Sequence, residues 1–231
     1  AYGKYNAPYY ESYLLNLGYE KEVDFVEYRI IVPDVIPERY ARAAELVSMK
    51  NGLRQAPLRC RADLNPYIDG IFKCMNAAYS NIHGFSELTP GQCDDLKKQF
   101  LGNVNVDYLS VILDHDDNVV AFGVGMPSIS AAMKKANGSL LPFGFIHILK
   151  ALKKNDTLDL LLIAIDEKYQ NKGINAMIFD KFAQGITKNK IKYIESTREL
   201  EENTSVQNLW GRFERTIHKR ARVYKKYIVK I

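Results

Sequence analysis

Apolar residues recur along the chain with two different periods, and the change of period separates predicted strands from predicted helices. The strongest strand signal is the near-continuous apolar run at 157–165, which is typical of a strand buried on both faces. Residues 171–185 follow it with Ile174, Met177 and Phe182 at helical spacing. A short apolar stretch at 191–196 predicts the next strand. This region therefore predicts a strand, helix and strand in that order.

The rest of the chain divides in the same way. Strands are predicted at 23–32, 58–64 and 221–231, and an Asp/Asn-rich turn predicts a hairpin of 108–113 with 119–124. Helices are predicted at 6–18, 38–50, 68–79, 89–101, 129–136, 145–154 and 203–217. Thr89 and Gln92 have the spacing of a capping box at the start of the fourth of these helices.

Composition adds exclusions to this picture. Apolar residues make up 47% and charged residues 26% of the 231 positions, which is ordinary for a globular protein. No apolar run reaches the roughly 20 residues of a membrane span, and no secretory signal opens the sequence. Three unpaired cysteines without zinc-ligand spacing fit a reducing compartment, so we expect a cytoplasmic protein with buried thiols and no metal.

Basic residues gather near the end of the sequence. They are Arg212, Arg215, Lys219, Arg220, Arg222, Lys225 and Lys226. Such a cluster is a solvated face, an anion-binding surface or a contact for nucleic acid. No DNA-reading motif accompanies it, so a nucleic-acid-binding protein is kept only as a second alternative.

The turn before residue 176 carries the clearest chemistry. A buried strand ends near Ile165, and a helix opens across the polar sequence QNKGINA at 170–176. The first N–H groups of a helix have no partner within the helix, and the helix dipole favours an anion there. Gly173 lets a ligand approach the backbone, and Lys172 adds positive charge. These features predict a site for a pyrophosphate.

The sequence Gln-x-x-Gly-x-(Gly/Ala) after a strand resembles the acetyl-CoA signature of the GNAT (GCN5-related N-acetyltransferase) superfamily. The resemblance implies an α+β fold with a mixed, mostly antiparallel twisted sheet flanked by helices. It implies that the pantetheine arm of acetyl-CoA or another acyl-CoA pairs with the backbone at the strand end. The cofactor-binding residues it implies are Ile163, Ala164, Ile165, Gln170, Asn171, Lys172, Gly173, Ile174, Asn175, Ala176 and Asn203.

Asn203 enters this list through a second motif, Asn203-x-x-Val206-x-x-Leu209-Trp210, about 30 residues further on. It resembles the family's Asn-x-x-Ala-x-x-Leu-Tyr. Two features depart from the first motif, because Glu167 stands for the usual Pro and Asn175 for the usual Gly or Ala. Trp210 stands for a Tyr that protonates the departing thiolate in the family, and an indole cannot do this.

Catalytic candidates are therefore sought elsewhere in the sequence. An attacking amine must lose a proton, so a carboxylate is expected near the site. Glu201 is preferred because it lies in a strand-to-helix loop, and Glu195 on the preceding strand is the other candidate. Tyr224 is the candidate to replace the missing acid.

The resemblance covers residues 57–231, and residues 1–56 are predicted to be the tail of a preceding half-domain. The predicted function is transfer of an acetyl or acyl group from acyl-CoA to a primary amine, by direct attack in a ternary complex. The acceptor is a small molecule or a peptide. A GNAT-like CoA-binding or regulatory module without turnover is the first alternative. The sequence leaves a homodimer open.

Overall fold

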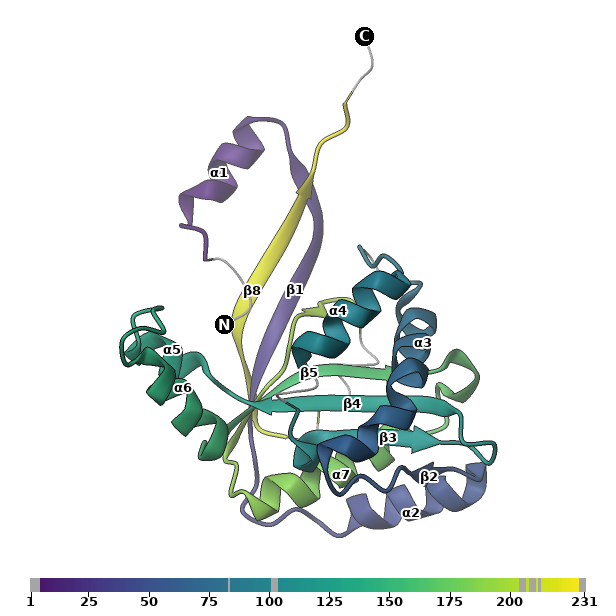
Figure 1. The fold of residues 1–231 in the computed structure, drawn as a ribbon. Helices are drawn as coiled ribbons and strands as arrows, with labels where there is room; N and C mark the ends of the chain where they lie inside the picture. Colours follow the sequence, from purple (N-terminus) through teal and green to yellow (C-terminus); the bar gives the residue numbers. More distant parts are fainter. Residues whose placement is uncertain are drawn as a thin grey trace.

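A single sheet with helices on both faces forms the body of the molecule (Figure 1). The computed structural model describes residues 5–82, 84–100, 104–203, 207, 211 and 213–228. The strands of the described residues are β1 (Glu20–Ile31), β2 (Arg54–Gln55), β3 (Leu109–Leu113), β4 (Val119–Pro127), β5 (Thr157–Ile165), β6 (Tyr193–Glu195), β7 (Glu199–Leu200) and β8 (Arg215–Lys225). The helices are α1 (Tyr9–Asn16), α2 (Arg39–Asn51), α3 (Ile68–Tyr79), α4 (Pro90–Phe100), α5 (Ser130–Lys135), α6 (Gly144–Lys153) and α7 (Asn175–Lys188).

The described strands lie in the order β2-β3-β4-β5-β6-β1-β7, with β8 paired to β1. The β5–β6 pair is parallel, and the other neighbours are antiparallel. The sheet is therefore mixed and mostly antiparallel, which confirms the predicted fold class. It also confirms the predicted hairpin of β3 and β4.

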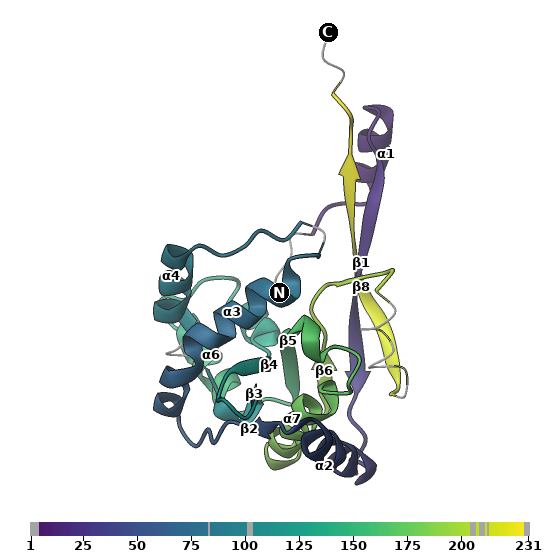
Figure 2. The ribbon, with the colours of Figure 1, turned by 90° about the vertical axis from the view of Figure 1, so that its right-hand side faces the viewer.

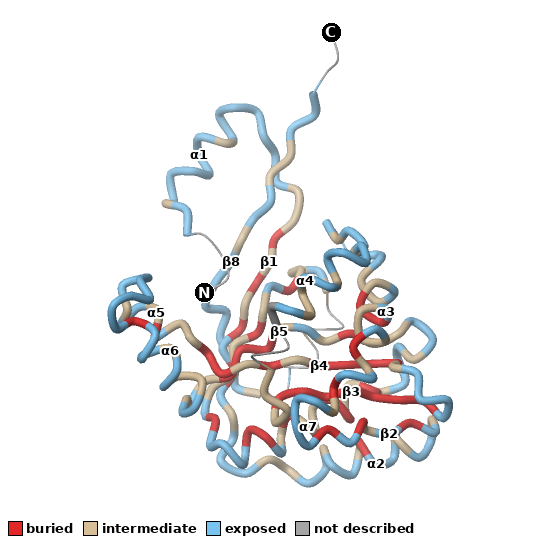
Figure 3. The backbone as a smooth tube through the Cα atoms, viewed as in Figure 1, coloured by how far each residue is buried: buried red, intermediate tan, exposed pale blue. Residues whose placement is uncertain are grey.

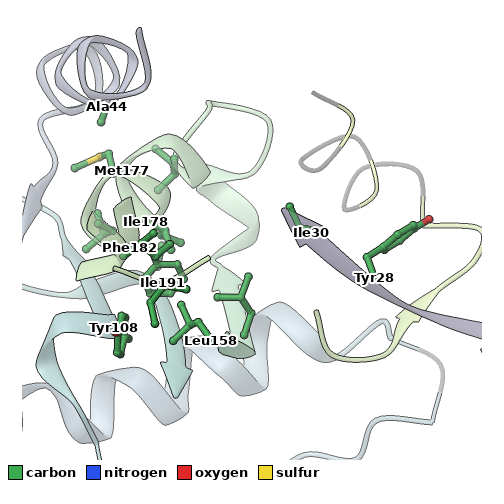
Figure 4. Close-up of a cluster of buried hydrophobic side chains, with 14 of the residues drawn as sticks. Tyr28, Ile30, Ala44, Tyr108, Leu158, Met177, Ile178, Phe182 and Ile191 are labelled. Atoms are coloured by element: carbon green, nitrogen blue, oxygen red, sulfur yellow. The ribbon is translucent and has the colours of Figure 1, made fainter. Parts of the chain in front are cut away.

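Two apolar layers bury the faces of the sheet. On one face, α2 and α7 pack on the strands, and Figure 4 shows Met177, Ile178 and Phe182 of α7 at the centre of this cluster. On the other face, α3 contributes Ile68 and Met75 to a second cluster with β3 and β4. Figure 3 shows that buried residues concentrate in these central strands.

The close approach of α7 to the sheet depends on Gly123 of β4. A Cβ atom added at Gly123 would lie 2.4 Å from Cγ2 of Ile178 and 2.9 Å from Cζ of Phe182. Real carbon atoms do not come this close, so any side chain at this position would push α7 away from the strands. The position of the loop that opens α7 therefore depends on a glycine two strands away from β6.

An arm made of α1 and the outer ends of β1 and β8 projects from the body (Figures 1 and 2). β1 nevertheless belongs to the main sheet, because Arg29, Ile30 and Ile31 pair with β6. No residue of α1 is buried. The division of the chain at residue 56 stays a prediction.

One predicted element is wrong, and another is predicted to end too late. Residues 58–64 form no strand, because the Asp63 carboxylate accepts hydrogen bonds from the N–H groups of Arg59 and Cys60 and closes a turn that leads into a 3₁₀ helix at Arg61–Tyr67. The predicted helix at 203–217 cannot extend to its end, because β8 begins at Arg215 and pairs with β1. Pairing along the length of β8 overrides the local helical pattern.

The helix predicted at 171–185 also begins later than expected, at Asn175. Asn171 and Gly173 have φ angles of 60° and 80°, in the left-handed region, and a helix cannot run through them. Residues 170–174 are therefore a true loop between β5 and α7.

Candidate active site at the split between β5 and β6

The strands β5 and β6 run side by side for only three residues and then separate. Their last pair is Asp159 with Glu195. Beyond it, β5 stays with β4 as far as Ile165, while the chain after β6 follows β1 through β7. The split opens the sheet at its centre, on the side of the sheet where β5 ends.

The open edge of β5 offers carbonyl groups that no neighbouring strand takes. Thr197 donates to the carbonyl of Leu161 at 3.4 Å, the Tyr79 hydroxyl donates to Ile163 at 2.9 Å, and the Gln170 amide donates to Ile165 at 3.2 Å. A carbonyl oxygen has two lone pairs, so each keeps one acceptor position for a ligand. Leu162 is 38% exposed on this strand, which corrects the expectation that both faces of β5 are buried throughout.

The loop at 170–174 presents backbone N–H groups just beyond this edge. Within the described part of the chain, the N–H groups of Asn171 through Asn175 have no backbone acceptor. They lie at the positive end of α7, where an anion is favoured. The Lys172 ammonium lies 5.0 Å from the centre of the Tyr169 ring, at the rim of the loop. Gln170 is held by its bond to Ile165.

Gly173 is required in this loop for two separate reasons. Its φ of 80° is unfavourable for residues with a side chain. A Cβ added here would lie 3.2 Å from Cγ2 of Val47 on α2, so α2 supports the loop from behind. Together these constraints fix the backbone in a conformation that leaves its N–H groups without a backbone acceptor.

A cavity of about 310 Å³ continues from this loop along the α7 face of the sheet. We call it the α7 cavity, and it is lined by Asn175, Ala176 and Phe179 of α7, Leu160 of β5, Ile194 of β6 and Ile30 of β1, among others. It therefore reaches from the first turn of α7 to the two strands that separate.

Acidic groups surround the point where the strands part. A pocket of about 220 Å³, the apex pocket, is lined by Glu27, Asp159, Glu195, Ser196, Thr197, Arg198 and Lys219. The Lys219 ammonium lies 2.7 Å from a Glu27 oxygen and 3.9 Å from a Glu195 oxygen. The predicted candidate Glu195 thus lies directly at the split.

Asp159 is the carboxylate that sequence reasoning missed. It is 5% exposed, and its Oδ1 atom has no hydrogen-bond partner among the described residues. Burial raises the pKa of Asp159, the nearby Glu195 carboxylate raises it further, and a hydrogen bond with Ser128 opposes this. A buried carboxylate with a free oxygen and a raised pKa is suited to take a proton near neutral pH. One charged residue inside the otherwise apolar run at 157–165 was the available signal.

The other predicted catalytic residues lie farther away. Glu201 follows β7, and its Oε1 accepts a hydrogen bond of 2.7 Å from Arg220. Tyr224 pairs with Lys21 on β1, eight residues beyond Arg29, the partner of Glu195. This separation is roughly 26 Å at the rise of a strand. The structure therefore does not bring Tyr224 to the split.

The second sequence motif is only partly visible. The carbonyl of Asn203 accepts a hydrogen bond of 3.1 Å from the N–H of Gln207, and its own N–H donates to Leu200. Val206, Leu209 and Trp210 lie outside the described residues.

The departures from the first motif have visible positions. The Glu167 carboxylate accepts a hydrogen bond of 3.0 Å from Asn81, which ties the turn after β5 to the end of α3. Asn175 is half-buried in the first turn of α7 and lines the α7 cavity.

Three basic residues of β8, Lys219, Arg220 and Arg222, are engaged in ion pairs. Arg222 binds both oxygens of Asp24, at 2.7 Å and 2.9 Å, and also lies 2.6 Å from Glu11. Arg220 pairs with Glu201, and Lys219 pairs with Glu27. These contacts favour the interpretation of the basic cluster as a network within the protein.

Two further expectations concern metals and thiols. The described residues place Asp114, His115 and Asp116 close together in the β3–β4 turn, where Asp114 accepts N–H groups of that same turn. The thiols are less buried than expected, because Cys74 is buried but Cys60 is exposed. No helix among the described residues has both the length and the apolar character of a membrane span.

The fold is that of the GNAT acetyltransferases. A GCN5-related N-acetyltransferase from Sphaerobacter thermophilus superposes with a TM-score of 0.55 at 9% identity, over 95% of this chain and 56% of the other. The glucosamine N-acetyltransferase region of a fungal multidomain β-N-acetylglucosaminidase gives a TM-score of 0.53 at 10% identity, over 96% of this chain and 23% of the other.

Among curated proteins, Protein YghO of Escherichia coli strain K12 is 26% identical over 229 residues, which are 96% of this chain. The chain spans 57% of the length of that relative. No family model matches the sequence.

Proposed function

We propose that the chain is an N-acyltransferase that moves an acyl group from coenzyme A to a primary amine at the split between β5 and β6. The proposal rests on three features that follow one another along the chain. The N–H groups of 171–175 that lack a backbone acceptor, the open edge of β5 and the buried Asp159 follow one another along a single strand and its loop. The proteins of the same fold named above are N-acetyltransferases, which supports the reaction class.

The donor would lie with its pyrophosphate on the amides around Gly173. Its pantetheine arm would follow the α7 cavity and pair with the free edge at Ile163 and Ile165. The thioester would then reach the point where the strands part. Binding at this loop uses the helix dipole and backbone amides, so it needs no metal.

The acceptor would enter by the apex pocket. Three carboxylates, those of Glu27, Asp159 and Glu195, line this pocket, and they outnumber the two cations Arg198 and Lys219. A carboxylate oxygen there suits an ammonium group. Asp159 would take one proton from the ammonium and leave a neutral amine. The amine nitrogen attacks the thioester carbonyl, a C–N bond forms and the C–S bond breaks. The nitrogen loses its second proton as the amide forms, and the departing thiolate takes up one proton to give free coenzyme A, while the proton on Asp159 returns to solvent. Positioning of the two substrates supplies most of the rate.

Two measurements test the proposal in sequence. Coenzyme A must raise the melting temperature, since a ligand that binds only the folded state stabilises it, by about 2.7 kcal/mol at 100 times its Kd. Release of free thiol from acetyl-CoA and octanoyl-CoA is then followed with a panel of amines, amino acids and short peptides. Failure of coenzyme A to shift the melting temperature would refute the proposal.

A CoA-binding module without turnover is the second candidate, because Trp210 replaces the tyrosine of the related motif. It predicts a melting-temperature shift with no thiol release from any amine of the panel. The buried, partly unpartnered Asp159 favours the enzyme, since such a group lowers stability and has no use in a passive binding site.

A further inference from the structure

A second apolar cavity lies on the opposite face of the sheet from the α7 cavity, beneath α3 and α4. We call it the α3–α4 cavity, and it has a volume of about 260 Å³. Its lining includes Ile71 and Met75 of α3, Leu96 of α4, Val124 of β4, and Leu161 and Leu162 of β5. Well-packed proteins keep few voids of this size, so we expect the cavity to bind a ligand.

The cavity meets the proposed active site at β5. Leu161 is the unpaired residue at the irregularity in the pairing of β5 with β4, between the pairs Val124–Leu162 and Gly125–Leu160. Asp159 lies two residues before Leu161, at the point where the strands part. Leu162, which lines the cavity, is also partly exposed.

The chemistry of the lining selects an uncharged hydrocarbon. Among the described residues that line the cavity, Lys97 alone carries a charge. Its ammonium lies 2.7 Å from Asp69 and 3.1 Å from Asp94, and the Asp69 side chain is largely exposed, so the charge is held at the outer surface. Burying an amine or a carboxylate in the remaining space would leave it unpaired at a high cost.

The direction in which the donor lies decides whether the donor or the acceptor reaches the α3–α4 cavity. With its pyrophosphate on the 171–175 loop, the donor runs back along β5 from Ile165 toward Leu161, so its acyl end arrives at the mouth of the cavity. The amine is drawn instead to the carboxylates of the charged apex pocket. Two pockets of opposite character thus flank Asp159.

We infer that the α3–α4 cavity binds the hydrocarbon chain of a medium-chain fatty acyl donor. A methylene group needs about the space of a water molecule, roughly 30 Å³, so the cavity holds a chain of roughly eight carbons. This inference rests on the proposed function and narrows its donor from acyl-CoA in general to a fatty acyl thioester.

The first test is a chain-length series on the unaltered protein. Binding of coenzyme A and of its acetyl, butyryl, octanoyl and palmitoyl thioesters is measured by calorimetry. The affinity should rise about fourfold for each methylene that enters the cavity and level off near eight carbons. Equal affinity for all thioesters and for coenzyme A would overturn the inference and leave the proposed function standing. If no member of the series binds, the proposed function fails as well.

Variants that fill the α3–α4 cavity test whether the acyl chain of the donor binds there. Val124→Phe and, independently, Leu96→Phe should abolish the preference for octanoyl-CoA over acetyl-CoA while leaving coenzyme A binding unchanged. Val223→Phe, on an exposed part of β8, adds the same bulk elsewhere and should keep the preference. The two cavity variants lie on different elements, so a folding defect in one leaves the other informative.

The same variants exclude the other occupant, an apolar portion of the acceptor. If they retain the octanoyl preference and instead raise the KM of an apolar amine, the cavity belongs to the acceptor and the inference is wrong.

Discussion

Asp159 is the residue on which the proposed proton transfer depends, and its surroundings distinguish it from the other carboxylates of the site. It is buried with one free oxygen, whereas Glu201 is paired with Arg220 and Glu27 with Lys219. The ion pairs occupy carboxylate oxygens of Glu201 and Glu27, whereas Oδ1 of Asp159 is left free to accept a proton.

Replacement of Asp159 by Asn should lower kcat by roughly 10²- to 10⁴-fold, the usual contribution of a general base, and leave the affinity for coenzyme A unchanged. Glu195→Gln serves as the matched control and should cost far less. Steady-state kinetics of thiol release gives both values. An equal loss of kcat in the two variants would show that Asp159 is not the general base.

The pH profile provides an independent check on the same residue. A base must be deprotonated, so kcat/KM should fall as the pH drops through the raised pKa of Asp159. Because the Glu195 charge contributes to that raised pKa, Glu195→Gln should move the acidic limb to lower pH. An unmoved limb would show that another group controls it.

Replacement of Asp159 should affect stability in the opposite direction from activity. An acid whose pKa is higher in the folded than in the unfolded state lowers stability at pH values above both. Asp159→Asn should therefore keep or raise the melting temperature at pH 7, while a merely structural carboxylate would lower it. Thermal unfolding of the two proteins at pH 7 decides the question.

At the scale of elements, the sequence predicts the strand, loop and helix of the site better than the partners of each strand. Local signals set the helix of α3, the capping box of α4 and the β3–β4 hairpin, because their contacts are close in sequence. The split between β5 and β6 depends on which strands pair with β5 and with β6, and no local sequence pattern predicts this pairing. β8 was misread for the same reason, since its pairing with β1 joins residues nearly 200 positions apart.

Gly173→Ala tests the loop as an element. It should destabilise the protein by about 1–2 kcal/mol through its left-handed backbone and abolish the melting-temperature shift produced by coenzyme A. Gly138→Ala is the matched control, because Gly138 also has a left-handed φ of 75° and has open space around its Cβ position. It should show a similar loss of stability and a normal shift. A normal shift in Gly173→Ala would remove the loop from the site.

At the scale of the whole molecule, charged contacts join β1 to β8, the two strands that run from the body into the arm. Asp24 on β1 is buried and held by Arg222 of β8 and by Lys21. The Arg222 guanidinium holds the pKa of Asp24 well below its ordinary value. The sequence of residues 1–56 does not reveal where this segment belongs. Its strand β1 lies in the sheet beside β6 and β8, which come from the far end of the chain.

This contact predicts how stability changes in acid. A carboxylate with a depressed folded-state pKa contributes stability above its unfolded pKa of about 4 and loses it as the pH falls below that value. Asp24→Asn should cost about 2 kcal/mol at pH 7, the scale of a charge-assisted hydrogen bond, and reduce the loss of stability between pH 4 and pH 2. Urea unfolding at several pH values measures both. Glu38→Gln, which removes an exposed pair with Arg42, should change little, and an equal cost would contradict the account.

The central claim is that coenzyme A lies on the α7 loop and along the free edge of β5, and backbone amide NMR during a titration tests it most directly. The account predicts saturable shifts concentrated at the amides of Asn171 through Asn175 and of Ile163 and Ile165, with little change on the arm. Shifts confined to other surfaces, or none at all at millimolar coenzyme A, would contradict it.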